Sequence, residues 1–443
     1  MKFIFAFQSI SLFGVLLFSN HVFAQSGRSP VSVKKSSTED IYYRGTEAFF
    51  ANKYEVAILY FDRVLKMDEE FYSRAYNKRG ECNIKLENYV EAQLDYDKAI
   101  ENAPRFAEAY NGRGALNIYL KNYDKAHSDL SDAIDLDPRY SEAFFNKGNL
   151  YFAKNELPKA IGFYTKAIKL NNYEYDYFIN RGIAYHDLEL YDSAISDLDS
   201  ALFLNPESLV ALKFRIKSNI ELKEFDLAME DFEEVLMLDS VEFWIWNNRG
   251  GLYVDMNEIE KGIEDYSKAI ELSPDTVYLY KNRAIAYRKL KQYDMAIMDY
   301  NKALEIDSTY AGALNNRGFV YDLIGEDELA VLDFSKSIEI DSAGADFSLN
   351  NRANSYRKLK QFEKAKMDVE KSLELNSENG WTYATLAFIF ADEGNDEKFF
   401  ENIEIAISKS LAYPLNEKLE EEKSLGKYKN DKRFLKILEK SEG

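Results

Sequence analysis

The sequence has little of what most catalytic and disulfide-stabilised proteins use. Its 443 residues contain one cysteine, three histidines and seven prolines. A single cysteine excludes a disulfide framework and a cysteine-rich metal site. The 76 acidic residues outnumber the 56 basic ones, for a net charge of -20. A chain this acidic repels nucleic-acid phosphates unless it carries a concentrated basic patch, which the sequence lacks, so we expect no nucleic-acid partner.

Motifs that carry chemistry are also missing. The sequence has no glycine-rich phosphate loop, no HExxH zinc motif and no nucleophile elbow. His127 and His186 lie far apart, without a second histidine or a cysteine at metal-ligand spacing. Cys82 occupies a place where other segments carry alanine or valine, which predicts a small buried core residue. We expect a protein that is no enzyme, with no catalytic residues, no metal and no cofactor.

The first 24 residues resemble an export signal. Lys2 precedes an apolar stretch from Phe3 to Phe18, and Val22 and Ala24 occupy the places where a signal peptidase needs small side chains. The alternative is an uncleaved anchor, but the apolar run of 16 residues is short of the ~20 that span a bilayer. We predict a signal peptide at 1–24, cleavage before Gln25, and no membrane insertion afterwards.

The destination of the exported chain follows from weaker signals. Residues 25–37 are small, polar and aperiodic, which predicts a flexible leader. The sequence contains no Asn-x-Ser/Thr glycosylation site, which favours a bacterial envelope over a eukaryotic secretory route. We therefore expect the protein in the periplasm, the cell envelope or the extracellular space.

A period of about 34 residues runs through the rest of the chain. A small residue marks the same place in successive repeats, and eleven such repeats cover 38–411. A second small residue follows twelve places later, and an aromatic residue or leucine four places after that. Within each repeat, apolar and small residues recur at three- and four-residue steps, which is the period of a helix. Each repeat is therefore predicted to be a helical hairpin. The residues at the first small place in the first five repeats are Gly45, Gly80, Gly114, Gly148 and Gly182.

The pattern resembles the tetratricopeptide repeat (TPR). One repeat matches it almost whole, with Gly182, Tyr185, Ala194, Leu198, Ala201 and Pro206. The resemblance implies an all-α fold, a right-handed α-solenoid of stacked TPR helical hairpins. Residues 412–443 do not repeat, and their broken apolar stripe predicts C-terminal capping helices over the open end of the stack.

A basic residue precedes the first small place in ten repeats, and in eight of them an aspartate follows sixteen residues later. An arginine ladder could bind anionic ligands. Recurrent pairing with aspartate instead favours ion pairs between first and second helices, within a repeat or between repeats, because guanidinium fits a carboxylate bidentately. The eight pairs are Arg79/Asp95, Arg113/Asp129, Arg181/Asp197, Arg215/Asp231, Arg249/Asp265, Arg283/Asp299, Arg317/Asp333 and Arg352/Asp368.

Asparagine recurs directly before this arginine. In the TPR family, polar side chains in this part of the first helix face a concave groove and hydrogen-bond the backbone of an extended peptide. The resemblance implies the same role here, and the alternative is a solvated polar ladder without a ligand. The asparagines are Asn146, Asn180, Asn248, Asn282, Asn316 and Asn351.

Aromatic residues that do not repeat fall on the predicted inner face of the later repeats. They are candidates for a binding stripe, because tryptophan and tyrosine dominate interface energetics, and the alternative is that they fill imperfect junctions. The candidate ligand-binding residues of this stripe are Trp244, Tyr278, Phe319, Phe347 and Trp381.

Together these features predict a non-catalytic protein–protein interaction scaffold of the bacterial cell envelope. Stacked hairpins form a long concave surface in which a partner peptide or helix can lie. A second hypothesis is a carbohydrate or cell-wall binding protein that stacks sugar rings on the aromatic stripe.

Overall fold

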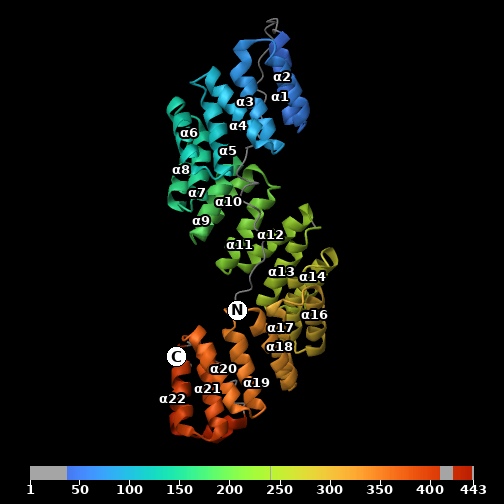
Figure 1. Ribbon diagram of the computed structural model, residues 1–443, viewed down its shortest axis with the longest axis vertical. Helices are drawn as coiled ribbons and strands as arrows, with labels where there is room; N and C mark the ends of the chain where they lie inside the picture. The colour runs from blue at the N-terminus through green and yellow to red at the C-terminus, as the bar shows by residue number, and fades with distance from the viewer. Residues whose placement is uncertain (1–36, 240, 410–422, 442–443) are drawn as a thin grey trace. The chain divides into compact units, whose positions relative to one another are not determined.

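The computed structural model describes residues 37–239, 241–409 and 423–441 (Figure 1). In these ranges the chain forms helices and turns without strands, which confirms the all-α prediction. The predicted signal peptide and residues 25–36 of the predicted leader lie outside the described residues, and α1 begins at Ser37.

The chain divides into two compact blocks, with the boundary between Ser240 and Val241. In the N-terminal block the helices are α1 (Ser37–Phe50), α2 (Tyr54–Val64), the short 3-10 helix η2 (Glu69–Phe71), α3 (Tyr72–Lys85), α4 (Tyr89–Asn102), α5 (Ala107–Tyr119), α6 (Tyr123–Leu136), α7 (Ser141–Ala153), α8 (Leu157–Leu170), α9 (Tyr175–Asp187), α10 (Tyr191–Leu204), α11 (Leu209–Glu221) and α12 (Phe225–Leu238). In the C-terminal block they are α13 (Phe243–Asp255), α14 (Ile259–Leu272), α15 (Val277–Lys289), α16 (Tyr293–Ile306), α17 (Ala311–Ile324), α18 (Asp327–Ile340), α19 (Asp346–Lys358), α20 (Phe362–Leu375), α21 (Gly380–Glu393), α22 (Asp396–Lys409), the 3-10 helix η3 (Lys423–Tyr428) and α24 (Lys432–Ser441).

Consecutive helices pair into hairpins. Each odd-numbered helix from α1 to α21 packs along the even-numbered helix that follows it, and each hairpin packs on the next within its block. The described residues contain eleven such hairpins, a count consistent with the predicted number of repeats. The predicted α-solenoid of stacked hairpins is confirmed.

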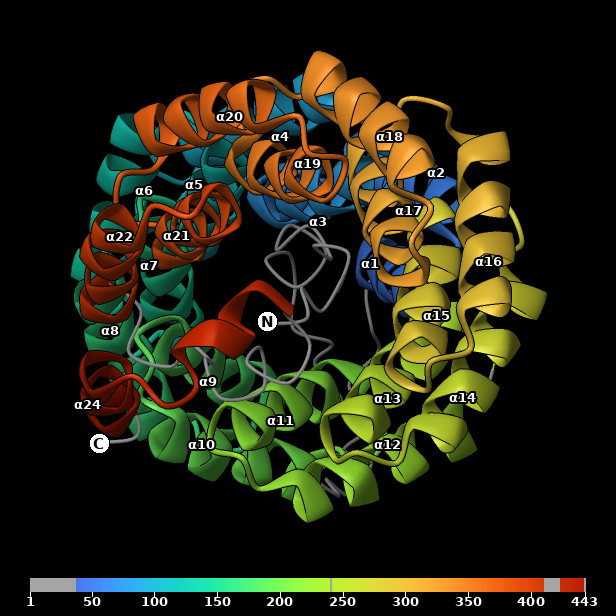
Figure 2. The ribbon, with the colours of Figure 1, turned by 90° about the horizontal axis from the view of Figure 1, so that it is seen from below.

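Within each block the first helices form one layer and the second helices the other (Figure 2). Successive first helices also contact each other, as α5 does with α3 and α7. Comparable contacts between successive second helices are sparser in the described ranges. Each block therefore curves toward its first helices, and we call the first-helix side of a block the inner layer and the second-helix side the outer layer.

The glycines of the first helices make room for a large side chain from the second helix, which is an aromatic ring for Gly148 and a leucine for Gly114 and Gly182. A Cβ atom on Gly148 would lie 2.5 Å from the ring of Tyr164, and one on Gly112 would lie 2.5 Å from the ring of Tyr96. Tyr96 also lies against Gly80 of its own repeat, so one ring contacts two successive first helices. The recurring glycine or alanine is thus a packing requirement of the stack.

The turn inside each hairpin requires a left-handed backbone. One residue per turn has a φ between 57° and 82°, yet only two of these residues are glycine, the type that adopts this conformation without strain. Sequence patterns based on glycine therefore detect only a minority of the turns. The residues are Asn52, Glu87, Lys121, Asn155, Glu189, Lys223, Asn257, Lys291, Gly325, Lys360 and Gly394.

The segment after the last hairpin covers its apolar side. Leu425 and Tyr428 of η3 and Phe434 of α24 are buried against α21 and α22. The rings of Tyr428 and Phe399 stack with centroids 4.0 Å apart. This packing of a 3-10 helix and an α-helix shields the end of the core, as a solenoid requires.

Two buried tyrosines provide a test of this core. The Tyr164 hydroxyl donates to Asn149 Oδ1 at 2.8 Å, whereas the equally buried Tyr96 hydroxyl has no hydrogen-bond partner. We expect Tyr164→Phe to lower the free energy of unfolding by about 1 kcal/mol, since a made hydrogen bond is lost. Tyr96→Phe removes an unsatisfied polar group and should leave stability equal or higher by up to ~1 kcal/mol. Urea unfolding of both variants measures the difference, and equal losses would contradict this account.

Candidate functional site

In the eight predicted pairs, the arginine before the small residue links the first helix of its hairpin to the second. In all eight predicted pairs the guanidinium bonds both oxygens of the aspartate sixteen residues later, so the within-repeat prediction is confirmed. In Arg283, for example, Nε and Nη2 donate to the two oxygens of Asp299, each at 2.8 Å. Because these guanidinium groups already bond a carboxylate of their own hairpin, the structure argues against an arginine ladder that binds anionic ligands.

The same guanidinium also reaches the preceding repeat. Nη1 of Arg283 donates to Ser267 Oγ at 2.9 Å, and Nη1 of Arg113 donates to Asp97 at 2.7 Å. The pairing is therefore both within and between repeats. Further Nη1 contacts of this kind join Arg79 to Asp62, Arg181 to Thr165, Arg215 to Asp199, Arg317 to Asn301 and Arg352 to Ser335.

Burial of these pairs carries an electrostatic cost. The side chain of Asp197 is 8% exposed, and burial raises its pKa even though Arg181 holds the carboxylate. The same direction holds for Asp231 and Asp265. Desolvation thus offsets much of the attraction, so the pairs select one arrangement of helices more than they add net stability.

Four of the six predicted asparagines form amide bridges between successive inner helices. Nδ2 of Asn146 donates to Asn111 Oδ1 at 2.9 Å, and Nδ2 of Asn282 donates to Asn247 Oδ1 at 2.9 Å. Asn180 likewise donates to Asn149, and Asn351 donates to Asn315. Asn248 accepts from Asn247 of its own helix, and Asn316 lies half-buried on α17.

Burial limits what these amides can offer to a ligand. Asn180, Asn248 and Asn282 are 1–8% exposed, whereas Asn146 and Asn351 are half-buried. The partners Asn111, Asn149 and Asn315 sit at neighbouring places of the repeat, outside the set predicted to bind. Their contact with a peptide remains a prediction, and what the structure adds is a network that spans adjacent repeats.

The predicted aromatic stripe is unevenly exposed. Phe347 on α19 is 57% exposed and Trp381 on α21 is 40% exposed. Trp244 and Tyr278, at the same place of earlier repeats, are half-buried, and Phe319 lies half-buried with the Arg288 guanidinium 5.1 Å from its ring centroid. All five belong to the inner layer of the C-terminal block, and of these five only Phe347 and Trp381 are exposed rather than half-buried.

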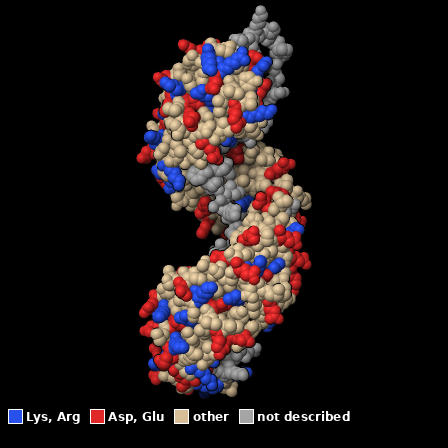
Figure 3. Space-filling view, turned by 45° about the vertical axis from the view of Figure 1, so that its right-hand side comes forward, with Lys and Arg blue, Asp and Glu red and all other residues tan. Residues whose placement is uncertain are grey.

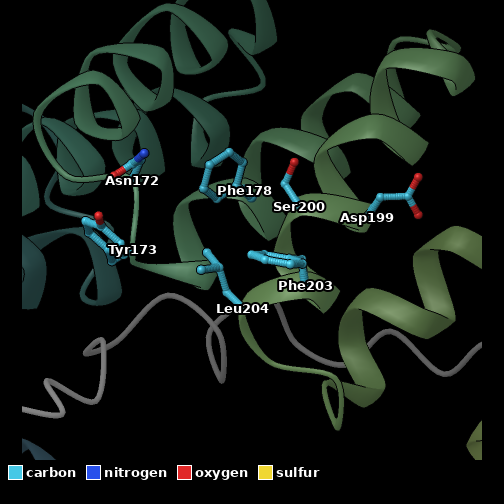
Figure 4. A pocket seen from close by; sticks show the side chains of 7 residues that line it. All are labelled: Asn172, Tyr173, Phe178, Asp199, Ser200, Phe203 and Leu204. Carbon is cyan, nitrogen blue, oxygen red and sulfur yellow. The ribbon is translucent and has the colours of Figure 1, made fainter.

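A shallow pocket in the N-terminal block is lined by the loop before α9, by Phe178 of α9 and by the end of α10 (Figure 4). Its lining includes Tyr173, which is 79% exposed, and Phe203, which is 87% exposed, with Asp199 and Ser200 at its edge. The sequence prediction missed these aromatics because it considered only inner places. A signal was present, since the place of Phe203 carries a charged residue in most repeats, such as Glu101.

The few residues that could carry chemistry are dispersed. Cys82 is fully buried, as predicted, and burial raises its pKa to about 12. The described ranges contain no group of three histidine, cysteine or carboxylate side chains that could hold a metal ion. Acidic and basic side chains are interspersed over the face in Figure 3. Among the described helices, none combines the length and apolar character needed to cross a bilayer.

Family models of the tetratricopeptide repeat match residues 42–105, 107–140, 141–172, 277–310 and 348–379, and a model described as TPR repeat matches residues 250–291. The chain is therefore built of tetratricopeptide repeats, as its sequence pattern suggests. No curated protein matches the chain.

Solved structures of other repeat proteins resemble it in fold. Yeast Tom70 is 15% identical, with a TM-score of 0.45, over 91% of this chain and 99% of that chain. The Cut9 complex with Hcn1 of the APC/C is 12% identical, with a TM-score of 0.45, over 88% and 97%. A tetratricopeptide repeat protein from Parabacteroides merdae is 21% identical, with a TM-score of 0.44, over 60% and 98%.

The arginine pairs predict a measurable coupling. Asp299→Ala should lower the free energy of unfolding by about 3 kcal/mol, because it leaves a part-buried guanidinium without its carboxylate. Arg283→Ala and the double variant complete a double-mutant cycle. We expect the double variant to lose about 2 kcal/mol less unfolding free energy than the two single variants lose together. The exposed pair Lys268/Glu271, at 2.8 Å, is the matched control and should couple by less than ~0.5 kcal/mol. Equal coupling in both cycles would refute the argument.

His186 predicts a loss of stability in mild acid. Burial, with a smaller effect of Lys217, lowers the pKa of His186 to about 4, and its Nδ1 lies 3.0 Å from Ser218 Oγ. The unfolded chain takes up this proton near pH 6.5 and the folded chain does not, so stability falls as the pH drops from 6.5 toward 4.

Because His186 is only partly buried, we expect it to contribute about 1–2 kcal/mol to this loss. His186→Gln should remove that contribution when urea unfolding at pH 7 and pH 4.5 is compared. His127→Gln, at an exposed position, is the control and should change the pH dependence little. Identical pH profiles for wild type and His186→Gln would contradict the prediction.

Proposed function

We propose that the protein is a non-catalytic protein–protein interaction scaffold of the bacterial cell envelope, which holds a partner peptide or helix along an inner layer. The observation that carries the proposal is the exposed apolar surface of Phe347 and Trp381 at the same place of successive inner helices. Large aromatic side chains supply contact area at low entropic cost, and they are the usual anchors of a protein interface.

The amide bridges support the same reading. An asparagine side chain can make more hydrogen bonds than the one or two that Asn146 and Asn351 make here, so half-buried amides keep capacity for a peptide backbone. Because each amide is already fixed by its neighbour, little side-chain freedom is lost on binding. The mechanism is binding and positioning, without a reaction.

The inner layer of the N-terminal block differs in character. The third to fifth repeats carry an acidic residue at the place of Trp244 and Trp381, namely Glu108, Glu142 and Asp176, whereas the second and sixth carry Arg74 and Val210. Burial, together with nearby Glu174, raises the pKa of Asp176 to about 6, so its ionised form at neutral pH is held at a cost. A partner segment that places a basic side chain there would relieve this cost, which favours a basic segment for the inner layer of this block.

The envelope location rests on residues 1–24 and the absence of glycosylation sites. Its direct check is the N-terminal sequence of the chain recovered from the envelope fraction of a bacterial host, which should begin at Gln25. Recovery in the cytosol with Met1 intact would contradict the envelope location. It would not affect the proposal that the protein is an interaction scaffold.

Affinity capture from envelope extract tests the binding surface. We expect a short, reproducible set of proteins on the wild-type chain, and we expect Phe347→Ala/Trp381→Ala to reduce their recovery by about tenfold or more. Phe203→Ala removes an aromatic of the outer layer that is more exposed, at 87%, than either Phe347 or Trp381, and it is the control. A set of captured proteins that persists on the inner variant, or that is lost on the control, would contradict the proposed surface.

A further inference from the structure

The outer layer of the C-terminal block carries a row of exposed apolar side chains. Met298 on α16, Leu332 on α18 and Met367 on α20 are 63%, 66% and 57% exposed. Met295 and Leu329, each 42% exposed, lie three residues before the first two and so on the same helix face. Five large apolar side chains on successive helices form a patch rather than scattered exposure.

The hairpin fold does not require apolar residues at this place. In the third to seventh repeats the same place is small or polar, and those hairpins form equally well. The row is therefore no requirement of the hairpin. Leu59 and Leu94 are apolar at this place in the first two repeats. Only in the eighth to tenth repeats do three successive hairpins carry an apolar residue there, and soluble proteins seldom retain such a patch without a use for it. The residues at this place in the third to seventh repeats are Ser128, Gly162, Ser196, Glu230 and Glu264.

Charges of opposite sign border the row on its two sides. An acidic residue lies four places before each row member, and a lysine lies four places after it, so all share the exposed helix face. Glu363 contacts Lys366 at 3.2 Å and Lys302 contacts Glu305 at 3.0 Å, but these are exposed pairs that solvent screens. The acidic row is Asp294, Glu328 and Glu363, and the basic row is Lys302, Lys336 and Lys371.

We propose that this face binds the same face of a second copy of the chain. In a two-fold dimer whose facing helices run antiparallel, the apolar rows meet and the acidic row of each copy faces the basic row of the other. A dimer with parallel helices would instead oppose like charges. The face is thus complementary to itself in one orientation only.

Self-association has a cost and a consequence. Two chains that each carry a net charge of -20 repel at long range, so the local match supports a dimer with a dissociation constant in the micromolar range. Because the contact uses the outer layer, the inner layer of each copy stays accessible. A dimer therefore offers two inner surfaces to one multivalent partner, which raises apparent affinity without new contacts.

Sedimentation velocity of the full chain over a range of concentrations tests the contact. We expect reversible dimerisation, with the dissociation constant raised about tenfold or more by Met298→Ser/Leu332→Ser. Serine stands at this place in two other repeats, so the fold should persist. Leu59 and Leu94 occupy the same place in the first two repeats and are 68% and 59% exposed, so Leu59→Ser/Leu94→Ser is a matched control that should leave the dimer intact.

Charge exchange tests the orientation and does not depend on the apolar variants. One variant carries glutamate at the three lysines of the basic row, and another carries lysine at the three carboxylates of the acidic row. Each alone should be monomeric, because like charges then meet, and an equimolar mixture should form a heterodimer. A wild-type chain that stays monomeric up to about 200 µM, a dimer lost only in the Leu59/Leu94 control, or a mixture that fails to associate would each overturn the proposal.

Discussion

In eight repeats the stack depends on one arginine of the first helix, and in seven of them its guanidinium joins three helices. The guanidinium of Arg283 is attached to a first helix, grips Asp299 of its own second helix with two donors, and reaches Ser267 of the preceding second helix with a third. A planar group with five donors can do this, and an ammonium cannot do it with the same geometry. At the place of this arginine, Lys147 makes only the backward contact, to Ser131 Oγ, and packs against Phe163 where an aspartate would otherwise stand.

The within-repeat half of this arrangement could be predicted, since arginine and aspartate recur together at a fixed separation of sixteen residues. The backward half could not. Its acceptors are of four residue types, as at Asp97, Thr165, Ser267 and Asn301, so no single residue type marks the place. The amide bridges show the same limit. Periodicity locates Asn146, but only the rotation between successive hairpins decides that it meets Asn111.

Exposure was harder to predict than helix position. Trp244 and Trp381 occupy the same place of the repeat, and the sequence pattern predicts the same exposure for both. Trp381 is 40% exposed, whereas Trp244 is half-buried. Burial on a solenoid depends on the side chains of the two neighbouring repeats, which a single-repeat pattern does not contain. The comparison among repeats was informative where it was made place by place. Phe203 stands out because most other repeats are charged at its place, and Met298 and Leu332 stand out because the third to seventh repeats are small or polar at theirs.

Selectivity in such a protein has to come from these departures. A residue that recurs in every repeat offers the same contact everywhere and cannot fix where along the stack a partner binds, because discrimination is a difference between alternatives. Packing and buried charge also restrict substitutions at the places of the arginine, the aspartate and the glycine. Surface places of the first and second helices carry no such constraint, since each repeat is held mainly by its neighbours through the core. The inner and outer layers can therefore vary independently, which allows one chain to carry a partner surface on one side and a different contact on the other.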